Sequence, residues 1–423
     1  MEYRFSEDFA RQADAADELK DFRSRFLFPR HGGEETVYFT GNSLGLQPAT
    51  VKEYLLRELE DWHTHGVEGH FNARNPWLSY HEMFAAPLAE LTGARETEVV
   101  AMGSLTNNLH LLMVSFYRPT AARYRIICEK KAFPSDTYAL QSQARFHGFD
   151  YRDAVVEVAP RENEYTIREE DILAAIEQYR DSVAMVMIGG VNYFTGQVFD
   201  MQKITAAAHD AGAFCGWDLA HGIGNVELKL HEWNVDFAAW CSYKYLNSSP
   251  GGVAGLFVHE KHVTDPRIPR FEGWWGTEPE TRFLMGDTFN PMRSAGAWQL
   301  SNAPVLAMAA HKASLDIFME AGLGRLRAKS RLLTGYLQFV VDGIKKEKGA
   351  GSIENITPSD EKQRGCQLSL VFPGRGKELF NALTENGVVS DWREPNVVRV
   401  APVPLYNTFG DVFRFGKILQ AIL

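Results

Sequence analysis

The sequence predicts an α/β protein built on a mostly parallel central sheet, with a smaller α+β domain at its C-terminal end. Between residues 124 and 258, short apolar segments of strand character alternate with amphipathic helical segments. This alternation is typical of parallel sheets, because each strand returns to the sheet through a crossover helix. After two long helical segments the pattern changes to strands around a single helix, which predicts the smaller domain.

The elements follow from this pattern in chain order. The first 30 residues are charged and helical in character, and an apolar helix is predicted over 109–116. The predicted strands of the central sheet are 124–128, 154–158, 183–188, 213–217, 235–240 and 252–258. The last of them follows its predecessor closely and is a candidate for an antiparallel strand. The predicted helices are 134–147, 168–179, 201–211, 303–319 and 323–341, and strands 367–372 and 397–400 enclose a helix at 377–386.

A chain of 423 residues is long enough for two or three domains. We expect an N-terminal segment, residues 1–50, that packs on one of two domains. A large α/β domain is predicted over 51–310 and a small α+β domain over 311–423.

Composition excludes several classes of function. The net charge of −10 has the wrong sign for non-specific binding to nucleic acid or to anionic membranes. No apolar stretch approaches the roughly 18 residues of a membrane span, and the N-terminus lacks the apolar region of a signal peptide. The four cysteines are scattered without a C-x-x-C pair, which is typical of reduced thiols in a cytoplasmic protein. No metal site is expected.

Two charged residues each end an apolar strand. Asp218 follows Trp217, and Lys244 lies 26 residues further on, after the apolar segment 237–240. Alone, Asp218 would more often be a helix cap and Lys244 a surface charge. Together, at one edge of a sheet, they suit a pyridoxal 5'-phosphate enzyme. There a lysine condenses with the cofactor aldehyde, and an acid keeps the pyridine nitrogen protonated.

Two helix starts could complete such a site. The segment 103–108 begins an apolar helix, whose free backbone N–H groups could bind a phosphate, although Ser104 or Thr106 could simply cap the helix. In Phe133-Pro134-Ser135-Asp136, the ring could stack on the cofactor and the acid could reach its polar edge, or both could be structural. His221 is a candidate for a cofactor contact, for orienting Asp218, or for an ordinary core histidine.

Arg399 lies inside the apolar strand 397–400, where a guanidinium is costly to bury without a partner. It could form a structural ion pair with a core acid. It could also bind the carboxylate of an amino-acid substrate through two hydrogen bonds. Arg393 is the competing candidate, in more polar surroundings.

Taken together, these residues resemble the kynureninase family, which is a family of fold-type-I pyridoxal-phosphate hydrolases. The resemblance covers nearly the whole chain. Its most specific parts are Phe133-Pro134-Ser135-Asp136, Gly273-Trp274-Trp275-Gly276 and Arg399-Val400-Ala401-Pro402-Val403-Pro404-Leu405-Tyr406. Tyr38-Phe39-Thr40-Gly41-Asn42-Ser43-Leu44-Gly45, Val191-Asn192-Tyr193 and Ser301-Asn302 also match.

The resemblance implies roles for individual positions. Lys244 would be the Schiff-base lysine and Asp218 the partner of the pyridine nitrogen. Tyr243 would contact the phosphate and take part in acid–base steps. The other cofactor-binding positions that it implies are Leu105, Thr106, Phe133, Ser135, Asp136, His221, Trp274 and Asn302.

The substrate side is implied in the same way. Arg399 matches the carboxylate clamp, and His70 matches a histidine of the substrate pocket. Asn302 matches a residue that the neighbouring subunit donates, which implies a homodimer with a shared active site.

The activity implied is hydrolysis of L-kynurenine, or of 3-hydroxy-L-kynurenine, to anthranilate or 3-hydroxyanthranilate and L-alanine. This reaction belongs to tryptophan catabolism and to the supply of NAD precursors. One alternative is another fold-type-I enzyme, a cysteine desulfurase or a β-lyase, for which Cys366 is the only candidate nucleophile. A second is a non-catalytic regulator that binds the same cofactor.

Overall fold

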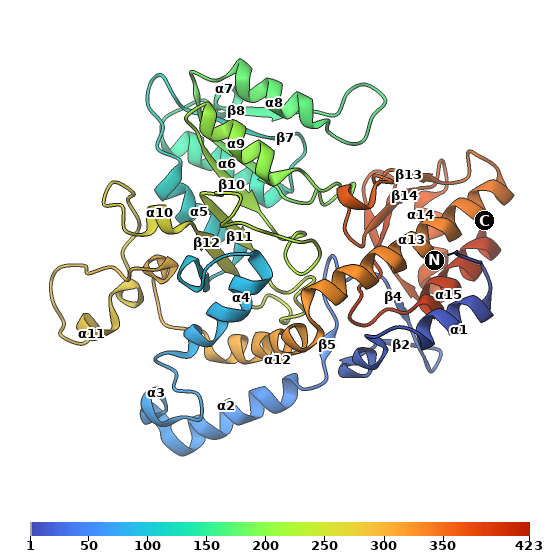
Figure 1. Cartoon of the computed structure of the whole chain (residues 1–423), viewed down its shortest axis with the longest axis horizontal. Helices are drawn as coiled ribbons and strands as arrows, with labels where there is room; N and C mark the ends of the chain where they lie inside the picture. Colours follow the sequence, from blue (N-terminus) through green and yellow to red (C-terminus); the bar gives the residue numbers. More distant parts are fainter. Residues whose placement is uncertain (1) are drawn as a thin grey trace.

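The computed structural model describes residues 2–423 and has an α/β architecture with two main sheets (Figure 1). The larger sheet has seven strands. In spatial order they are β6 (Val99–Ala101), β12 (Gly255–Val258), β11 (Phe237–Trp240), β10 (Phe214–Asp218), β9 (Val183–Gly189), β7 (Arg125–Glu129) and β8 (Val155–Val158). Neighbouring strands from β11 to β8 pair in parallel, whereas β12 pairs antiparallel with both β11 and β6. The prediction of an antiparallel strand at 252–258 is therefore confirmed.

Helices cover both faces of this sheet because successive strand residues point to opposite sides. Ile127 and Val186 belong to the core that includes α8 (Glu169–Gln178) and α9 (Met201–Asp210). Ile126 and Met185, their neighbours in sequence, belong instead to the core of the opposite face. Two helices pack in that second core: α5 (Leu105–Phe116) and α6 (Pro134–Phe146).

The smaller sheet is antiparallel and lies to the right of the larger one in Figure 1. Its strands are β13 (Glu354–Asn355), β14 (Leu368–Val371), β17 (Val397–Val400) and β16 (Asp391–Arg393). A separate hydrophobic core joins it to four helices. They are α1 (Glu7–Ala15), α13 (Leu323–Lys348), α14 (Gly376–Glu385) and α15 (Phe409–Ile422).

The N-terminal segment contacts both parts of the protein, because its Gly45 backbone donates to the Tyr243 carbonyl of the larger part and other residues bind the smaller part. The Asp14 carboxylate accepts hydrogen bonds from the backbone of Phe409 and Gly410, and β4 (Val37–Tyr38) pairs in parallel with β15 (Val388–Val389). Further on, α2 (Val51–His65) packs along α12 (Val305–Ala321) beneath the larger sheet. The domain limits proposed from the sequence stay a prediction, and residue 310 lies inside α12.

The remaining elements are short. The helices are α3 (Gly69–Asn72), α4 (Ala85–Thr92), α7 (Tyr151–Ala154), α10 (Glu260–Val263) and α11 (Pro279–Arg282). The 3₁₀ helices are η1 (Lys20–Arg25), η2 (Gly66–Glu68), η3 (Tyr80–Phe84), η4 (Glu96–Glu98), η5 (Trp274–Gly276), η6 (Ala295–Trp298) and η7 (Glu361–Gln363). Two further strand pairs are antiparallel: β1 (Phe26–Leu27) with β5 (Gln47–Pro48), and β2 (Arg30–His31) with β3 (Glu34–Glu35).

Three predicted helical segments have clearly different limits in the structure. The helix expected over 323–341 continues to Lys348 in α13. The helix expected over 109–116 begins at Leu105, because the extended residue Ser104 precedes it, so Thr106 lies in its first turn. The helical N-terminus contains only α1 and η1, because Asp17 turns the chain by accepting a hydrogen bond from the Leu19 backbone at 2.9 Å. Among residues 2–423, no helix is long and apolar enough to cross a membrane.

Gly216 provides a test of packing in the strand that ends at Asp218. A Cβ atom there would lie 2.0 Å from Cζ of Phe237, its register partner in β11. Because neither backbone can move far within the sheet, Gly216→Ala should lower the free energy of unfolding by about 1–3 kcal/mol. Urea denaturation measures this change.

Gly343→Ala is the matched control. Gly343 is exposed within α13, five residues before the end of the helix, and an added Cβ has nothing within 4 Å. This change should raise stability by about 0.5–1 kcal/mol, because alanine favours the helix. Equal effects of the two substitutions would contradict the packing argument.

Candidate active site

The carboxyl-terminal edge of the larger sheet holds a cavity of about 220 Å³. In open α/β sheets this edge is the usual place for a ligand, because strand ends and helix starts meet there. Each of β6, β7, β9, β10 and β11 is followed by residues that line the cavity. The lining residues are Ser104, Leu105, Thr106, Glu129, Phe133, Ser135, Asp136, Gly189, Val191, Tyr193, Asp218, Ala220, His221, Tyr243 and Lys244. The structure thus brings together nine of the residues predicted for the site, from Leu105 to Lys244.

Lys244 lies in the wall of this cavity and is buried. Its Nζ atom is 3.1 Å from Nε2 of His221 and 5.5 Å from the centre of the Phe133 ring. Burial and the positive charge of Lys244 lower the pKa of His221 well below its usual value. The imidazole is therefore neutral and can accept a hydrogen bond from the lysine amine.

Three carboxyl groups line the cavity with this lysine, two of them at strand ends and one, Asp136, in the first turn of α6. Asp218 ends β10, and its Oδ1 accepts a hydrogen bond from the Ala220 backbone at 2.7 Å. Asp136 is hydrogen-bonded to Asp218, and burial together with that neighbouring charge raises the pKa of Asp136 well above its usual value. Burial also raises the pKa of Glu129 to about 7. Since like charges in a buried site cannot all ionise, Asp136 holds a proton beside Asp218.

The N-terminus of α5 also reaches the cavity. Leu105 and Thr106 form its first turn and line the cavity. Within residues 2–423, the Ser104 side chain accepts no capping hydrogen bond, so the first backbone N–H groups of the helix remain available to an anion.

Tyr243 also lines the cavity, next to Lys244. Burial and the neighbouring Cys241 thiol raise the pKa of its phenol, so the free protein keeps this group protonated. The Tyr243 carbonyl accepts a hydrogen bond from the backbone of Gly45 at 2.8 Å. A Cβ at position 45 would lie 2.4 Å from the carbonyl oxygen of Lys244, so only glycine permits this approach. The N-terminal motif around Gly45 therefore supports the lysine loop.

Three predicted site residues lie outside the cavity that contains Lys244. Trp274, Asn302 and His70 line a second cavity of about 420 Å³, with Phe71 and Leu300 among its apolar walls. The structure brings these three residues together in one cavity, but it separates them from Lys244.

Arg399 is fully buried in β17 and lies behind the lining of the first cavity. Its Nη1 donates to the Tyr193 carbonyl at 2.7 Å and its Nη2 to Asp391 Oδ2 at 2.7 Å. Arg393 Nη2 donates to the same carboxylate oxygen at 3.1 Å. The structural ion pair considered from the sequence is therefore present. One acid serves two guanidinium groups, so an excess positive charge remains beside the cavity.

Sequence reasoning missed Glu129. It ends the apolar strand β7 just as Asp218 ends β10, and this shared pattern of an acid after a buried strand could have identified it. Tyr193 was noticed only as part of a motif. The structure shows its ring edge-on to Phe133, with the ring centres 5.2 Å apart.

Solved structures identify the class to which this fold belongs. A cysteine desulfurase from Thermococcus onnurineus aligns with a TM-score of 0.74 at 17% identity, covering 92% of this chain and 94% of that one. A cysteine desulfurase from Escherichia coli aligns with a TM-score of 0.75 at 17% identity, covering 96% and 98%. A mutant of the enzyme C-DES with glycine covalently linked to its PLP cofactor aligns with a TM-score of 0.74 at 14% identity, covering 91% and 96%. The protein has the fold of the fold-type-I pyridoxal-phosphate enzymes.

Sequence comparison narrows the class to one family. A protein named kynureninase from Flavobacterium psychrophilum is 54% identical over 413 residues, covering 98% of this chain and 97% of its own. Another of that name from Nematostella vectensis is 48% identical, covering 98% and 94%. Residues 326–419 also match the family described as the kynureninase C-terminal domain. The chain belongs to the kynureninase family, whose members are pyridoxal-phosphate-dependent hydrolases that cleave a carbon–carbon bond.

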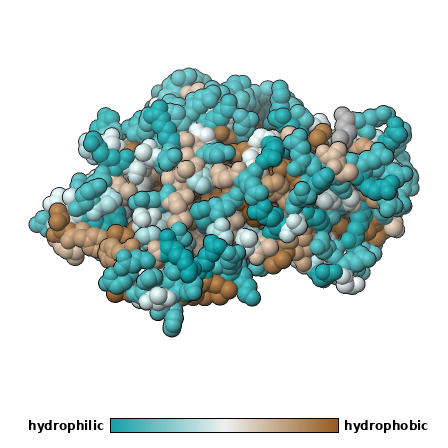
Figure 2. All heavy atoms as spheres, turned by 60° about the horizontal axis from the view of Figure 1, so that its bottom comes forward, coloured by the Kyte–Doolittle hydropathy of each residue, from teal (hydrophilic) through white to brown (hydrophobic). Residues whose placement is uncertain are grey.

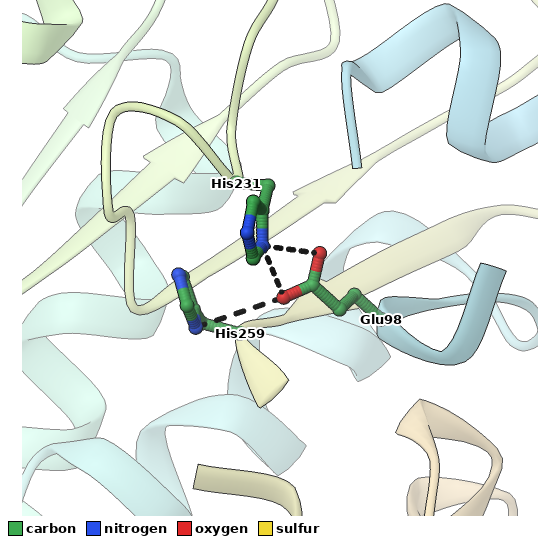
Figure 3. A group of neighbouring side chains, drawn as sticks. All are labelled: Glu98, His231 and His259. Carbon is green, nitrogen blue, oxygen red and sulfur yellow. Dashed lines mark hydrogen bonds and ion pairs between the residues drawn. The ribbon is translucent and has the colours of Figure 1, made fainter. Parts of the chain in front are cut away.

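A second group of ionisable side chains lies at the opposite edge of the sheet (Figure 3). The buried Glu98 carboxylate lies between His231 and His259, and their possible ligand atoms are within 4.8 Å of one another. The two imidazoles are stacked, with centroids 4.9 Å apart and planes inclined by 21°. A bound metal would have to lie near both ring planes, about 2.0–2.1 Å from each nitrogen. Because the two rings are stacked and nearly parallel, their planes do not meet at a point that close to both nitrogens. The two imidazoles therefore cannot share one metal ion in this arrangement.

The hydrogen bonds of Glu98 favour a structural role for this group. One oxygen accepts from the Arg95 backbone and the other from the Glu260 backbone, both at 2.8 Å, and His231 Nδ1 lies 2.9 Å from the carboxylate. The carboxylate thereby joins η4, the loop before β11 and the start of α10.

Glu98→Ala should therefore lower the free energy of unfolding by about 3 kcal/mol, because it leaves two part-buried backbone N–H groups and an imidazole without their buried acceptor. Glu260→Gln is the control. Glu260 forms an exposed ion pair with Arg95, so its loss should cost less than about 1 kcal/mol. Urea denaturation compares the two variants, and equal losses would contradict the role given to Glu98.

Proposed function

We propose that the cavity around Lys244 hydrolyses L-kynurenine, or 3-hydroxy-L-kynurenine, to L-alanine and anthranilate, or 3-hydroxyanthranilate. One observation carries this proposal. Asp218 and Lys244, from adjacent parallel strands, line one buried cavity in a chain that is 54% identical to a kynureninase over nearly its full length. The reaction belongs to tryptophan catabolism and supplies precursors of NAD.

The residues present fit pyridoxal phosphate. The cavity is lined by three acids, by the uncapped N-terminus of α5 and by the aromatic ring of Phe133. Asp218 would receive the ring nitrogen, α5 the phosphate, and Lys244 the aldehyde. When bound, the cofactor condenses with amines through its aldehyde, and its protonated ring takes up the electron pair released from the substrate's α-carbon.

The acid pair determines the charge opposite the ring. Asp136 carries the proton of the pair and donates it to Asp218, so the two groups together hold one negative charge. That charge faces the ring nitrogen and favours its protonated form. If Glu129 were also ionised, its negative charge would lack a compensating cation in the cavity. Burial raises the pKa of Glu129 to about 7, which favours its neutral form.

The lysine moves the substrate's α-proton. Its amine lies 3.1 Å from a neutral imidazole, which orients Nζ and does not compete for protons, since the pKa of His221 is well below its usual value. Tyr243 is protonated in the free protein and lies beside Lys244, so it can donate a proton where negative charge develops as the carbon–carbon bond of the substrate breaks.

Arg399 would hold the substrate's carboxylate, with Arg393 nearby. Asp391 cannot neutralise both guanidinium groups, and the Nε atoms of both are buried without a partner in the described part of the chain. An incoming carboxylate would supply the missing negative charge and would orient the α-carbon.

The second cavity supports a homodimer with a shared site. The surface near it is strongly apolar: Leu284 and Met285 are 74% and 76% exposed, and Phe71, Phe283 and Leu300 are exposed as well. Figure 2 shows apolar side chains gathered toward the left end of the molecule, where α11 lies in Figure 1. A second copy would cover this surface and bring Trp274, Asn302 and His70 to the partner's Lys244.

A cytoplasmic location fits the four cysteines, which are free and buried.

The desulfurase alternative finds little support. Burial raises the pKa of Cys366 to about 12, whereas a nucleophilic cysteine needs exposure and an accessible thiolate.

Anthranilate fluorescence tests the activity directly. The purified protein supplied with pyridoxal phosphate should release anthranilate from L-kynurenine, and a parallel assay with 3-hydroxy-L-kynurenine compares the two substrates. Lys244→Ala should abolish turnover and the visible absorption of the bound cofactor, because no amine remains to condense with its aldehyde. Sulfide release from cysteine without anthranilate would favour the desulfurase, and cofactor binding without either product would favour a regulator.

Mixed dimers test the shared site. Lys244→Ala and Asn302→Ala should each be inactive or nearly so, but together they should recover activity. Random pairing leaves one intact site in half of the dimers, which predicts about a quarter of the wild-type rate. Absence of recovery after confirmed subunit exchange would place Asn302 in its own chain's site or outside any site.

A further inference from the structure

The loop 192–195 follows β9 and forms one wall of the active-site cavity. Tyr193 lines the cavity and lies edge-on to Phe133, the ring proposed to stack on the cofactor. Asn192 shapes the loop, because its Oδ1 accepts hydrogen bonds from the backbone of Phe194 and Thr195 at 3.0 Å. The position of this loop therefore determines where Tyr193 meets Phe133.

The smaller sheet holds this loop by its carbonyl groups. The Tyr193 carbonyl accepts from Arg399 Nη1 at 2.7 Å and from Gln367 Nε2 at 3.2 Å. Ser369 pairs directly with Arg399 across β14 and β17, and Gln367 lies two residues before Ser369. Since strand residues two apart share a face, all three side chains point toward the loop.

The next two carbonyls are held from the same side. Ser369 Oγ donates to the Phe194 carbonyl at 2.6 Å, and Thr357 Oγ1 donates to the Thr195 carbonyl at 2.6 Å. Both hydroxyl residues are buried. The smaller sheet thus binds three consecutive carbonyl groups of a loop that belongs to the larger sheet.

The Gln367 amide has one orientation in this network. Its Oε1 accepts from Asn42 Nδ2 at 3.0 Å, so its NH₂ group faces Ser369 Oγ at 3.0 Å and the Tyr193 carbonyl. Asn42 and Gln367 are both buried. The amide of Asn42, which lies in the N-terminal motif, therefore directs the donor of Gln367 toward the active-site loop.

We propose that Gln367 is a positioning residue, which keeps Tyr193 in the cavity wall when Arg399 binds the substrate's carboxylate. Arg399 already uses Nη2 for Asp391 and Nη1 for the Tyr193 carbonyl. A carboxylate bound by two hydrogen bonds competes for these N–H groups, and Gln367 then remains as the donor to Tyr193. The assignment of the carboxylate to Arg399 rests on the function proposed above. The hydrogen bonds from Arg399 and Gln367 to the Tyr193 carbonyl do not depend on that function.

Gln367→Met tests this role, because methionine keeps the length of the side chain and removes the donor. Loss of one buried hydrogen bond to the cavity wall should weaken pyridoxal-phosphate binding about fivefold to tenfold. KM for L-kynurenine should rise about tenfold, because in this variant the binding of a carboxylate to Arg399 removes the last of the two hydrogen bonds to the Tyr193 carbonyl. In contrast, kcat should change less than about threefold. In the cofactor-free protein, amide hydrogen exchange of residues 193–195 should accelerate.

Thr357→Val is the matched control. It removes the neighbouring bond to the Thr195 carbonyl and the acceptor of the Ser369 backbone N–H, and it leaves both donors to Tyr193 in place. Cofactor affinity and KM should stay within about twofold of wild type. A purely structural role for Gln367 predicts instead that the two variants change unfolding, cofactor affinity and KM alike, and that result would overturn the proposal.

Asn42→Ala is a second variant in case Gln367→Met does not fold. It removes the group that orients Gln367 without touching the loop, and should weaken cofactor binding about twofold to threefold. Unchanged cofactor affinity and unchanged exchange of residues 193–195 in this variant would also overturn the proposal. Because both readouts need no substrate, they distinguish a failure of this inference from a failure of the proposed reaction.

Discussion

The active site depends on the burial of three carboxyl groups beside a single lysine. Asp218 and Glu129 end β10 and β7, the parallel strands on either side of β9, and Asp136 lies in the first turn of α6, so all three reach one cavity at the same edge of the sheet. Buried like charges cannot all ionise, so the raised pKa values of Asp136 and Glu129 show a site with more acid than its own cation can balance. A protonated pyridine ring supplies the kind of charge that this arrangement lacks. The same imbalance, with the opposite sign, occurs where Arg393 and Arg399 share Asp391.

The smaller sheet contributes to the site by binding the loop 192–195. The residues that line the cavity itself follow strands of the larger sheet. Arg399 and Gln367 bind the Tyr193 carbonyl, so the group proposed to hold the substrate also holds part of the cavity wall. The N-terminal segment supports both parts, since Asn42 orients Gln367 and Gly45 supports the carbonyl of Tyr243. In the proposed function, these direct hydrogen bonds link substrate binding to cofactor placement.

The two edges of the larger sheet serve different purposes. At the carboxyl-terminal edge, polar groups face a cavity and retain unused hydrogen-bonding capacity. At the opposite edge, Glu98 bonds to two backbone N–H groups and an imidazole, and the stacked rings of His231 and His259 do not converge on a common point. Clusters of similar composition therefore differ in function according to whether their hydrogen bonds are already satisfied within the protein.

The sequence by itself determined the α/β class, most strands and helices of the larger sheet, and the pairing of Asp218 with Lys244. Periodicity and strand-end residues are local signals, and strands that run parallel bring their ends to one edge. Only the tertiary structure decided that Glu129 joins the acid group and that Arg399 is bound to both Asp391 and Tyr193. It also separated Trp274 and Asn302 from Lys244. These outcomes depend on which segments distant in sequence become neighbours, and on how charges share one buried space, neither of which local spacing specifies.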